Sequence, residues 1–442
     1  MATAVSDRLP RTIGLFSAVA IIVGTTIGSG IFRVPASVAA QLGEPGPVLL
    51  AWVLGGVLAL FGALTLAELA AMFPRSGGVF AYIEEGLGRM PAFLFGWSQL
   101  AVIRASALGG ISTIFAEYLG YFLKFTPSQV RYVAAGTILF VALINYLSTT
   151  AAAKVVSNFM IAKYVAMVAL IVLAFTAGDG SFSHFSGTGS TAFSMSMVAS
   201  ALVSIMWAYD GWADLSYIGG EIKNPGRNIP LALVIGTTMI IVVYLLMNAA
   251  YVYLVPVPEM AGDRLIASTA ASRIPLLGGA GAGIIAAVVM ISCFGSLNGS
   301  MLTNPRVFFA MADRGLFFKG VARVSPKRQT PSVAIWLAAV LGCIYVLLND
   351  FQQLADRFVL GIWPFYIMAI ISVFILRKRS PDLERPYKTF GYPIVPIIFL
   401  LAATGMVINA FVTDPLNTGV TFAIIGAGLP VYYFGFRNRS AS

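Results

Sequence analysis

The chain has 442 residues, of which 58% are hydrophobic and only 10% are charged, and its mean hydropathy is +0.87. Soluble domains carry about 25% charged residues, so the composition excludes an ordinary soluble protein and predicts a polytopic protein of the lipid bilayer. The net charge is +10, but the cations lie in short loops between apolar segments, which argues against a nucleic-acid partner. Cys293 and Cys343 both fall inside apolar segments, and no spacing typical of a metal site or a cofactor site is present.

Apolar segments of about 20 residues, the length that crosses about 30 Å of hydrocarbon, recur along the whole chain. They predict an all-α integral membrane protein with 12 transmembrane helices, at about 13–40, 46–73, 91–122, 128–149, 153–177, 193–219, 229–255, 279–310, 331–349, 354–376, 393–413 and 417–436. A short interfacial helix is expected at 77–88, and a longer outer loop is expected after the seventh span.

Lysine and arginine are divided unequally between the two sets of connecting segments. If the N-terminus is cytoplasmic, most of them fall in inner segments. The outer segments then contain only Lys124, Arg131, Arg264, Arg273 and Arg357. The positive-inside rule therefore predicts a multi-pass protein of the cell (inner) membrane with both termini in the cytoplasm.

The first apolar segment is interrupted by GTTIGSGIF (24–32), which places Gly28, Ser29 and Gly30 where a membrane helix should be most regular. Glycine is the poorest helix former after proline, and unwound backbone at membrane depth is tolerated only inside protein or beside a wet cavity. A break there exposes N–H groups at the start of one half-helix and C=O groups at the end of the other, which suit a carboxylate and an ammonium group. Alternatively, the glycines only allow close helix packing.

The sixth segment is interrupted at Asp210-Gly211, and Asp214 follows one turn later. An ionisable group at this depth either faces a cavity or makes a structural hydrogen bond to a neighbouring helix. Interruptions in corresponding helices of two halves are typical of inverted-repeat transporters with a substrate site at the midplane. The paired breaks therefore predict an inverted repeat, although no repeat can be detected in residue identities.

Lys163 lies deep in the fifth span, too far from the ends for its ammonium group to reach the surface easily. A buried lysine is costly unless carbonyls, hydroxyls or a carboxylate receive it, so Lys163 is interpreted as a tether between helices. Arg33, three residues after the first break, either lines an outer vestibule or makes a structural pair. Glu68 and Arg104 are interpreted as structural.

Several long stretches together resemble one known family. They are IGSGIF (27–32), FPRSGGVFAYIEEGLG (73–88), WAYDGW (207–212), GGEIKNPGRNIP (219–230), SCFGSLNGSMLTNPRVFFAMADRGLFF (292–318), LRKRSPDLERPYK (376–388) and GLPVYYFGF (428–436). On these motifs the chain is similar to prokaryotic members of the L-type amino acid transporter family, within the amino acid–polyamine–organocation superfamily.

The resemblance implies a LeuT-like fold, a 5+5 inverted repeat whose first and sixth helices are broken. The repeats would lie at about 13–177 and 193–376, with appended helices at about 393–436, in a single transporter domain (1–442). It implies that N–H groups of 28–30 hold a substrate carboxylate, that carbonyls on both breaks hold its ammonium group, and that Trp207 is an aromatic gate. Asp210 and Asp214 stand where large-neutral relatives have other pocket residues, and Asp210 in particular leaves a cationic substrate open. The residues implied in substrate binding are Thr26, Ile27, Gly28, Ser29, Gly30, Trp207, Ala208, Asp210, Cys293 and Trp363.

The resemblance also aligns Lys163 with a family lysine at the position of the cation in sodium-coupled relatives. A fixed ammonium group there would make sodium unnecessary, with Ser296 and Ser300 as candidate acceptors of its hydrogen bonds. Eukaryotic relatives bind a glycoprotein heavy chain through a cysteine between spans three and four. Segment 120–132 has no cysteine here, so no disulfide-linked partner is expected.

The sequence therefore predicts a sodium-independent amino acid transporter, an exchanger of neutral L-amino acids that works by alternating access and needs no cofactor. The alternatives are a proton-coupled symporter, in which Asp210 or another acid titrates, and a cationic amino acid transporter. An integral-membrane enzyme is more remote, because no nucleophile–base pair, metal ligands or phosphate loop lie at membrane depth. A channel would not need two broken helices around one site.

Overall fold

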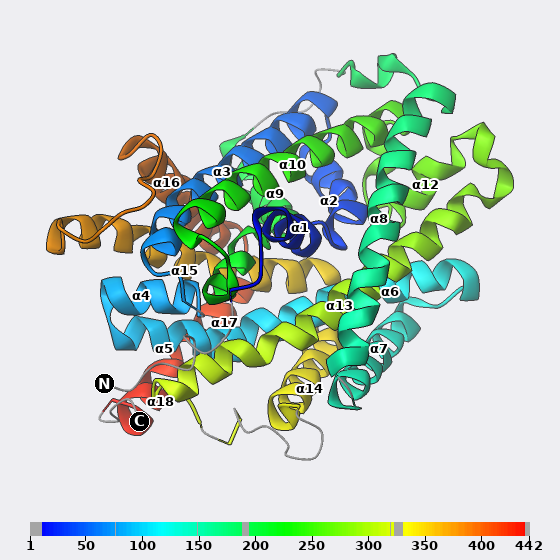
Figure 1. Ribbon diagram of the computed structural model, residues 1–442. Coiled ribbons are helices and arrows are strands. Elements are labelled where there is room, and N and C mark those ends of the chain that lie inside the picture. The colour runs from blue at the N-terminus through cyan, green and yellow to red at the C-terminus, as the bar shows by residue number, and fades with distance from the viewer. Residues whose placement is uncertain are drawn as a thin grey trace.

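The computed structural model describes residues 11–75, 77–147, 149–187, 194–318, 320–321 and 330–437. Within these residues the chain is helical apart from its connections (Figure 1). The strand-like pairing in the described part is one isolated parallel bridge between Ile13 and Ile222. The prediction of an all-α protein is confirmed.

Each of the predicted spans corresponds to a helical segment of the described residues. Eight segments are long and apolar enough to cross a membrane, and four more are shorter apolar helices. The uninterrupted spans are α3 (Pro45–Met72), α5 with η3 and α6 (Arg89–Ser98, Gln99–Ile103, Arg104–Leu123), α7 (Pro127–Leu147), α8 (Thr149–Ala177), α10 (Pro225–Leu254), α13 (Gly281–Asp313), α14 (Ser332–Leu348), α15 (Phe351–Arg379), α16 (Ile394–Thr413) and α17 with α18 (Pro415–Gly426, Gly428–Gly435).

The first and sixth spans are broken, as predicted. The first consists of α1 (Leu15–Thr26), η2 (Gly30–Phe32) and α2 (Val34–Leu42), and the sixth of α9 (Met195–Tyr209), η5 (Trp212–Tyr217) and η6 (Gly219–Glu221). Gly211 has a φ of +118°, in the left-handed region. Only glycine adopts such a backbone without strain, so this residue ends α9 and redirects the chain.

The short connecting helices are α4 (Val79–Leu87), η4 (Phe182–Phe185), α11 (Val257–Met260), α12 (Ile266–Ser272) and η7 (Pro275–Ala280). Predicted boundaries differ from the observed ones by a few residues. The expected interfacial helix at 77–88 is α4, but its apolar first residues, 79–83, are buried. It packs against α15, because its apolar side chains are buried more completely there than at a membrane surface.

The helices form two groups that α15 joins (Figure 1). In one group α1 and α3 pack on α10, and α9 packs on α2 and α3. In the other, α13 packs on α6 and α8, and α14 packs on α6 and α7. The helices α16 and α17 lie against α15, in keeping with appended elements. The inverted-repeat relation between 13–177 and 193–376 stays a prediction.

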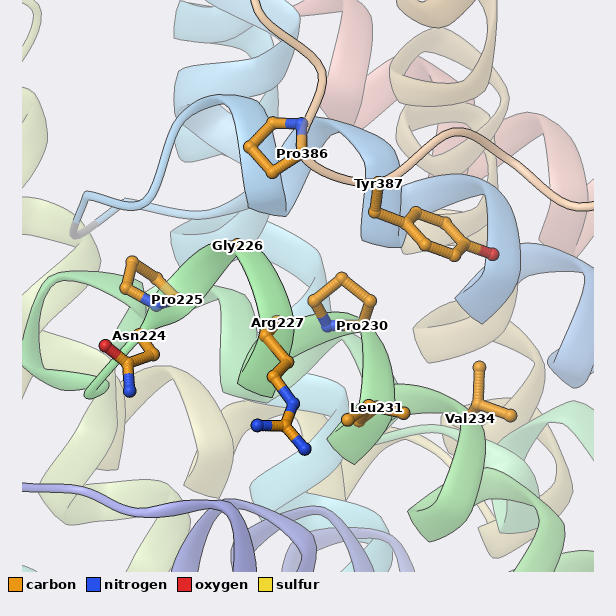
Figure 2. Close-up of a pocket in the computed structure, with 9 residues that line it drawn as sticks. All are labelled: Asn224, Pro225, Gly226, Arg227, Pro230, Leu231, Val234, Pro386 and Tyr387. Atoms are coloured by element: carbon orange, nitrogen blue, oxygen red, sulfur yellow. The ribbon is translucent and has the colours of Figure 1, made fainter.

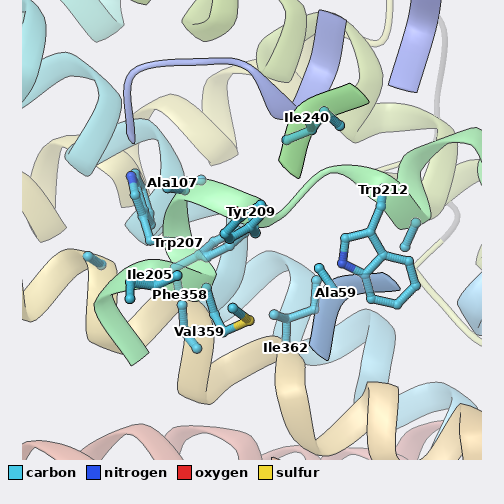
Figure 3. Packing of buried hydrophobic residues seen from close by; sticks show 14 of the residues in the cluster. Ala59, Ala107, Ile205, Trp207, Tyr209, Trp212, Ile240, Phe358, Val359 and Ile362 are labelled. Atoms are coloured by element: carbon cyan, nitrogen blue, oxygen red, sulfur yellow. The ribbon is translucent and has the colours of Figure 1, made fainter. Parts of the chain in front are cut away.

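Aromatic side chains fill the core beside the second break. Trp207 and Tyr209 precede the break and Trp212 follows it, and Figure 3 shows all three packed above residues of α15. Tyr209 also contacts Trp52 of α3 and Tyr244 of α10, with ring centroids 5.8 and 5.1 Å apart. The broken segment is therefore held by large rigid rings on both sides.

Candidate substrate site at the two helix breaks

The two breaks touch each other through glycines. A Cβ atom added to Gly30 would lie 2.7 Å from Ala208 Cα and 3.3 Å from Trp207 Cδ1. A Cβ atom added to Gly211 would lie 2.8 Å from Thr26 Cα. Real Cβ atoms do not approach that closely, so each break depends on a glycine where the backbone of the other passes.

In the described part of the chain, the first break leaves N–H groups without a backbone carbonyl partner, and the N–H group of Gly28 instead faces the Tyr244 hydroxyl oxygen. The N–H groups of Phe32 and Arg33 donate to Ser29 O and Gly30 O, at 3.2 and 3.0 Å. Within the described residues, no backbone carbonyl accepts the N–H group of Gly28 or Ser29. Such donors at the start of a half-helix form a favourable environment for a carboxylate.

The carbonyls predicted to hold a substrate ammonium group already have one partner each from the protein. Thr26 O and Ala208 O each lie 3.0 Å from Tyr244 Oη, and the two breaks are thereby joined to α10. Tyr244 was missed at the sequence level. Its signal in the sequence was a single hydroxyl group in the otherwise apolar stretch IIVVYLLM. A carbonyl oxygen has two lone pairs, so a second donor can still be accepted.

Lys163 lies on α8 and reaches the end of α1. Its side chain is buried, and Nζ donates to Gly24 O at 2.9 Å and to Ile27 O. These carbonyls belong to the last turn before the break, whose own helical partners are missing. The ammonium group therefore replaces the absent N–H donors and fixes the end of α1 to α8.

The residues expected on α13 have different positions relative to Lys163. Cys293 is fully buried and lies within electrostatic range of its ammonium group. Ser296 faces the first break, since its Oγ lies 3.4 Å from a Cβ position built on Gly28. Ser300 lies one turn further along α13. The recorded hydrogen bonds of Lys163 go to carbonyls of the first span rather than to Ser296.

Asp210 and Trp363 are connected through Tyr366 of α15. Tyr366 Oη donates to Asp210 Oδ1 at 2.9 Å. Trp363 lies with its ring centroid 6.1 Å from that of Tyr366 and stacks on Phe399 of α16 at 5.3 Å. Asp210 thus makes the hydrogen bond to a neighbouring helix that was one of its two interpretations. Trp363 packs chiefly between α15 and α16.

Aromatic side chains of α15 cover the ring of Trp207. Its ring makes edge contacts with Phe358 and Phe351 of α15, with centroids 5.0 and 5.9 Å apart. On its other side a Cβ atom added to Gly110 would meet the ring at 2.6 Å. The indole is only 8% exposed, so the breaks are closed off on the side that carries α2.

An ion-pair layer lies beyond this cover. Arg33 Nε bonds Glu117 Oε2 at 3.0 Å, Arg264 Nε lies 3.8 Å from Glu117 Oε1, and the Arg33 guanidinium sits 5.0 Å from the Phe351 ring centroid. Arg33 also lines a pocket of about 480 Å³ together with Asp356. Arg33 therefore makes the structural pair that was one of its interpretations and also lines this pocket, while its place in an outer vestibule stays a prediction.

The opposite end of the bundle is held by Glu68, which is buried in α3. Its carboxylate accepts two hydrogen bonds from Arg377, at 2.6 and 2.8 Å, and two from Thr389, each at 2.7 Å. This network supports its structural interpretation. Arg104 Nε donates to Gln99 Oε1 at 2.9 Å, within the continuous third span.

Two broken helices that meet inside a membrane bundle, with backbone donors and acceptors of both breaks facing one region, are typical of a secondary transporter. The family described as amino acid permease matches residues 13–436. The chain belongs to this family.

Curated relatives extend over nearly the same length. The chain is 33% identical to the serine/threonine exchanger SteT of Bacillus subtilis over 99% of both chains. It is 34% identical to the human b(0,+)-type amino acid transporter 1 over 93% of this chain and 84% of the relative. It is 31% identical to the human cystine/glutamate transporter over 96% of this chain and 85% of the relative. The proteins it matches are transporters rather than enzymes.

Proposed function

We propose that this protein is a sodium-independent exchanger of neutral L-amino acids that works by alternating access. The observation that carries the proposal is the Lys163 ammonium group at the first break, bonded to Gly24 O and Ile27 O. A cation in this position would otherwise have to be supplied from solution to satisfy the exposed carbonyls. A fixed ammonium group supplies it permanently, so transport needs no sodium gradient.

The charged groups of an amino acid substrate are complementary to the backbone groups of the two breaks. Its carboxylate would accept hydrogen bonds from the N–H groups of Gly28, Ser29 and Gly30. No backbone carbonyl of the described residues competes at the first two, and at Gly28 the competing acceptor is the Tyr244 hydroxyl oxygen. Its ammonium group would use the remaining lone pairs of carbonyls at 26–27 and 207–208. Because both charged ends are recognised by backbone, the side chain alone would select among amino acids.

The membrane arrangement follows from the distribution of cations. With both termini in the cytoplasm of the cell membrane, α2 and the cover over Trp207 face outward. The structure then corresponds to a state closed on the outside. Cys293 and Cys343 are free thiols within α13 and α14, and the proposal includes no disulfide-linked heavy chain.

Asp210 supports the second candidate, a cationic or proton-coupled transporter. Within the described residues its carboxylate has no ion-pair partner within 4.0 Å, and its recorded side-chain partner is the Tyr366 hydroxyl. A cationic side chain or a proton could neutralise it. Competition by lysine and arginine, and a pH gradient across the vesicle, distinguish these alternatives from neutral exchange.

The experiment is uptake of radiolabelled serine and threonine into proteoliposomes that contain the purified full-length protein. Neutral exchange predicts rapid uptake only when unlabelled neutral amino acid is present inside. Equal uptake into empty vesicles would contradict exchange. Dependence on an inward proton gradient, or strong inhibition by lysine alone, would favour the alternatives at Asp210.

A further inference from the structure

A second pocket lies at the start of α10, away from both helix breaks. It encloses about 660 Å³ between the first turns of α10 and the connection from α15 to α16 (Figure 2). One wall is tightly built, because a Cβ atom added to Gly226 would meet Pro386 Cβ at 2.8 Å. The lining residues are Asn224, Pro225, Gly226, Arg227, Pro230, Leu231, Val234, Pro386 and Tyr387.

The polar end of the pocket carries the cationic side chain of Arg227. The Arg227 side chain is exposed, and among the described residues it has no recorded side-chain hydrogen bond or ion pair. Lys223 and Lys388, each next in sequence to a lining residue, are also exposed. The lining contains no carboxylate. Glu384, the acid nearest in sequence to Pro386, is exposed on the connection. This end is therefore complementary to an anion.

Tyr387 adds an oriented hydroxyl group. Its Oη accepts the N–H group of Phe390 at 3.4 Å, which leaves its own hydrogen free to be donated. Figure 2 shows this hydroxyl group pointing away from the Arg227 guanidinium, so it is a separate polar group of the lining and not a second donor at the cationic end.

The other end of the pocket opens onto an apolar row. Leu231 and Val234 line the pocket, and Ile235, Met239 and Val242 continue along α10 at helical spacing. Leu231, Ile235, Met239 and Val242 are between 36% and 50% exposed. In a helix that crosses a bilayer, such a row faces acyl chains. The pocket thus joins a cationic end at the inner surface to a hydrocarbon-facing surface.

We propose that this pocket binds an anionic phospholipid of the inner leaflet. The phosphodiester would pair with Arg227, while an acyl chain would lie over Leu231 and Val234. A basic pocket at the cytoplasmic end of transmembrane helices is suited to anionic head groups. The apolar row favours a lipid over a free phosphate, and the absence of a carboxylate from the lining favours an anionic over a zwitterionic head group.

The test is native mass spectrometry of the purified full-length protein titrated with phosphatidylglycerol or with phosphatidylcholine of the same acyl chains. We expect a single tight adduct with phosphatidylglycerol that phosphatidylcholine does not form and that inorganic phosphate does not displace. Arg227→Ala should weaken this adduct about fivefold, the effect of one cation at an anionic lipid. Val234→Trp should weaken it by filling the apolar end. Lys378→Ala, which removes an exposed inner cation outside the pocket, should not.

Two results with the lipids themselves would overturn the proposal. One is equal affinity of the wild type for both lipids. The other is wild-type affinity for phosphatidylglycerol in both Arg227→Ala and Val234→Trp, each shown to be folded by its melting temperature. Displacement by inorganic phosphate at equal concentration would assign the site to a free anion instead and would also contradict a lipid site.

Discussion

At the scale of single residues, the strongest prediction concerns the replacement of Lys163. Its ammonium group supplies donors to Gly24 O and Ile27 O, and each buried polar group left without a partner costs about 1–3 kcal/mol. Lys163→Met should therefore lower thermal stability and slow exchange sharply, with a smaller effect on substrate affinity. Lys378→Met, on an exposed position of α15, is the matched control. Exchange at the wild-type rate in Lys163→Met would show that the contact is dispensable.

Replacement of Gly30 tests whether substrate binding needs the close approach of the two breaks. An alanine Cβ there would lie 2.7 Å from Ala208 Cα, and overpacking of this kind costs about 1–3 kcal/mol. Gly30→Ala should separate the breaks and abolish substrate binding while the protein still purifies as a monodisperse species. Gly46→Ala, where nothing lies within 4 Å, should bind normally. Binding is measured as substrate-induced thermal stabilisation, and equal stabilisation of both variants would refute the argument.

At the scale of elements, Tyr244 couples α10 to both broken spans through one hydroxyl group. Tyr244→Phe removes the donor shared by Thr26 O and Ala208 O and should cost about 0.5–1.5 kcal/mol of stability, together with slower exchange. Tyr251→Phe on the same helix is a sharp control, because the buried Tyr251 hydroxyl finds no partner among the described residues. Identical melting temperatures and exchange rates in the two variants would contradict a coupling role.

Replacement of Trp207 tests the layer in which its ring from α9 packs between α6 and α15. Its ring fills the space between Phe358, Phe351 and Gly110, so a smaller side chain leaves a path through the outer layer. Trp207→Ala should reduce exchange more than stability, and Trp207→Phe should restore it in part. The measurement compares initial exchange rates with melting temperatures across the three proteins. If Trp207→Ala exchanges at the wild-type rate, the indole serves only packing.

The sequence was most informative about which helices form and where they break. It was least informative about which groups their polar side chains contact. The breaks at Gly28–Gly30 and Gly211 could be predicted because glycine clusters and an aspartate interrupt otherwise continuous apolar runs. The deep position of Lys163 was equally visible. Its acceptors could not be chosen, because Ser296 and the carbonyls of α1 are far from it in sequence and only packing selects between them. Tyr244 and Glu117 were missed for the same reason, since a single polar group in an apolar helix does not name its partner.

For the whole molecule, the decisive property is what drives transport. The carbonyls at the first break bond a cation that belongs to the chain, the Lys163 ammonium group, so an external cation has no unsatisfied acceptors of this kind to occupy. Exchange of neutral amino acids by the wild-type protein should therefore be unchanged when choline replaces sodium on both sides of the vesicle. Lys163→Met serves as the internal comparison, because lithium or sodium could partly restore its exchange if the vacated position accepts a cation. A strict sodium requirement in the wild type would overturn the proposal, since the fixed ammonium group would then not have replaced the mobile ion.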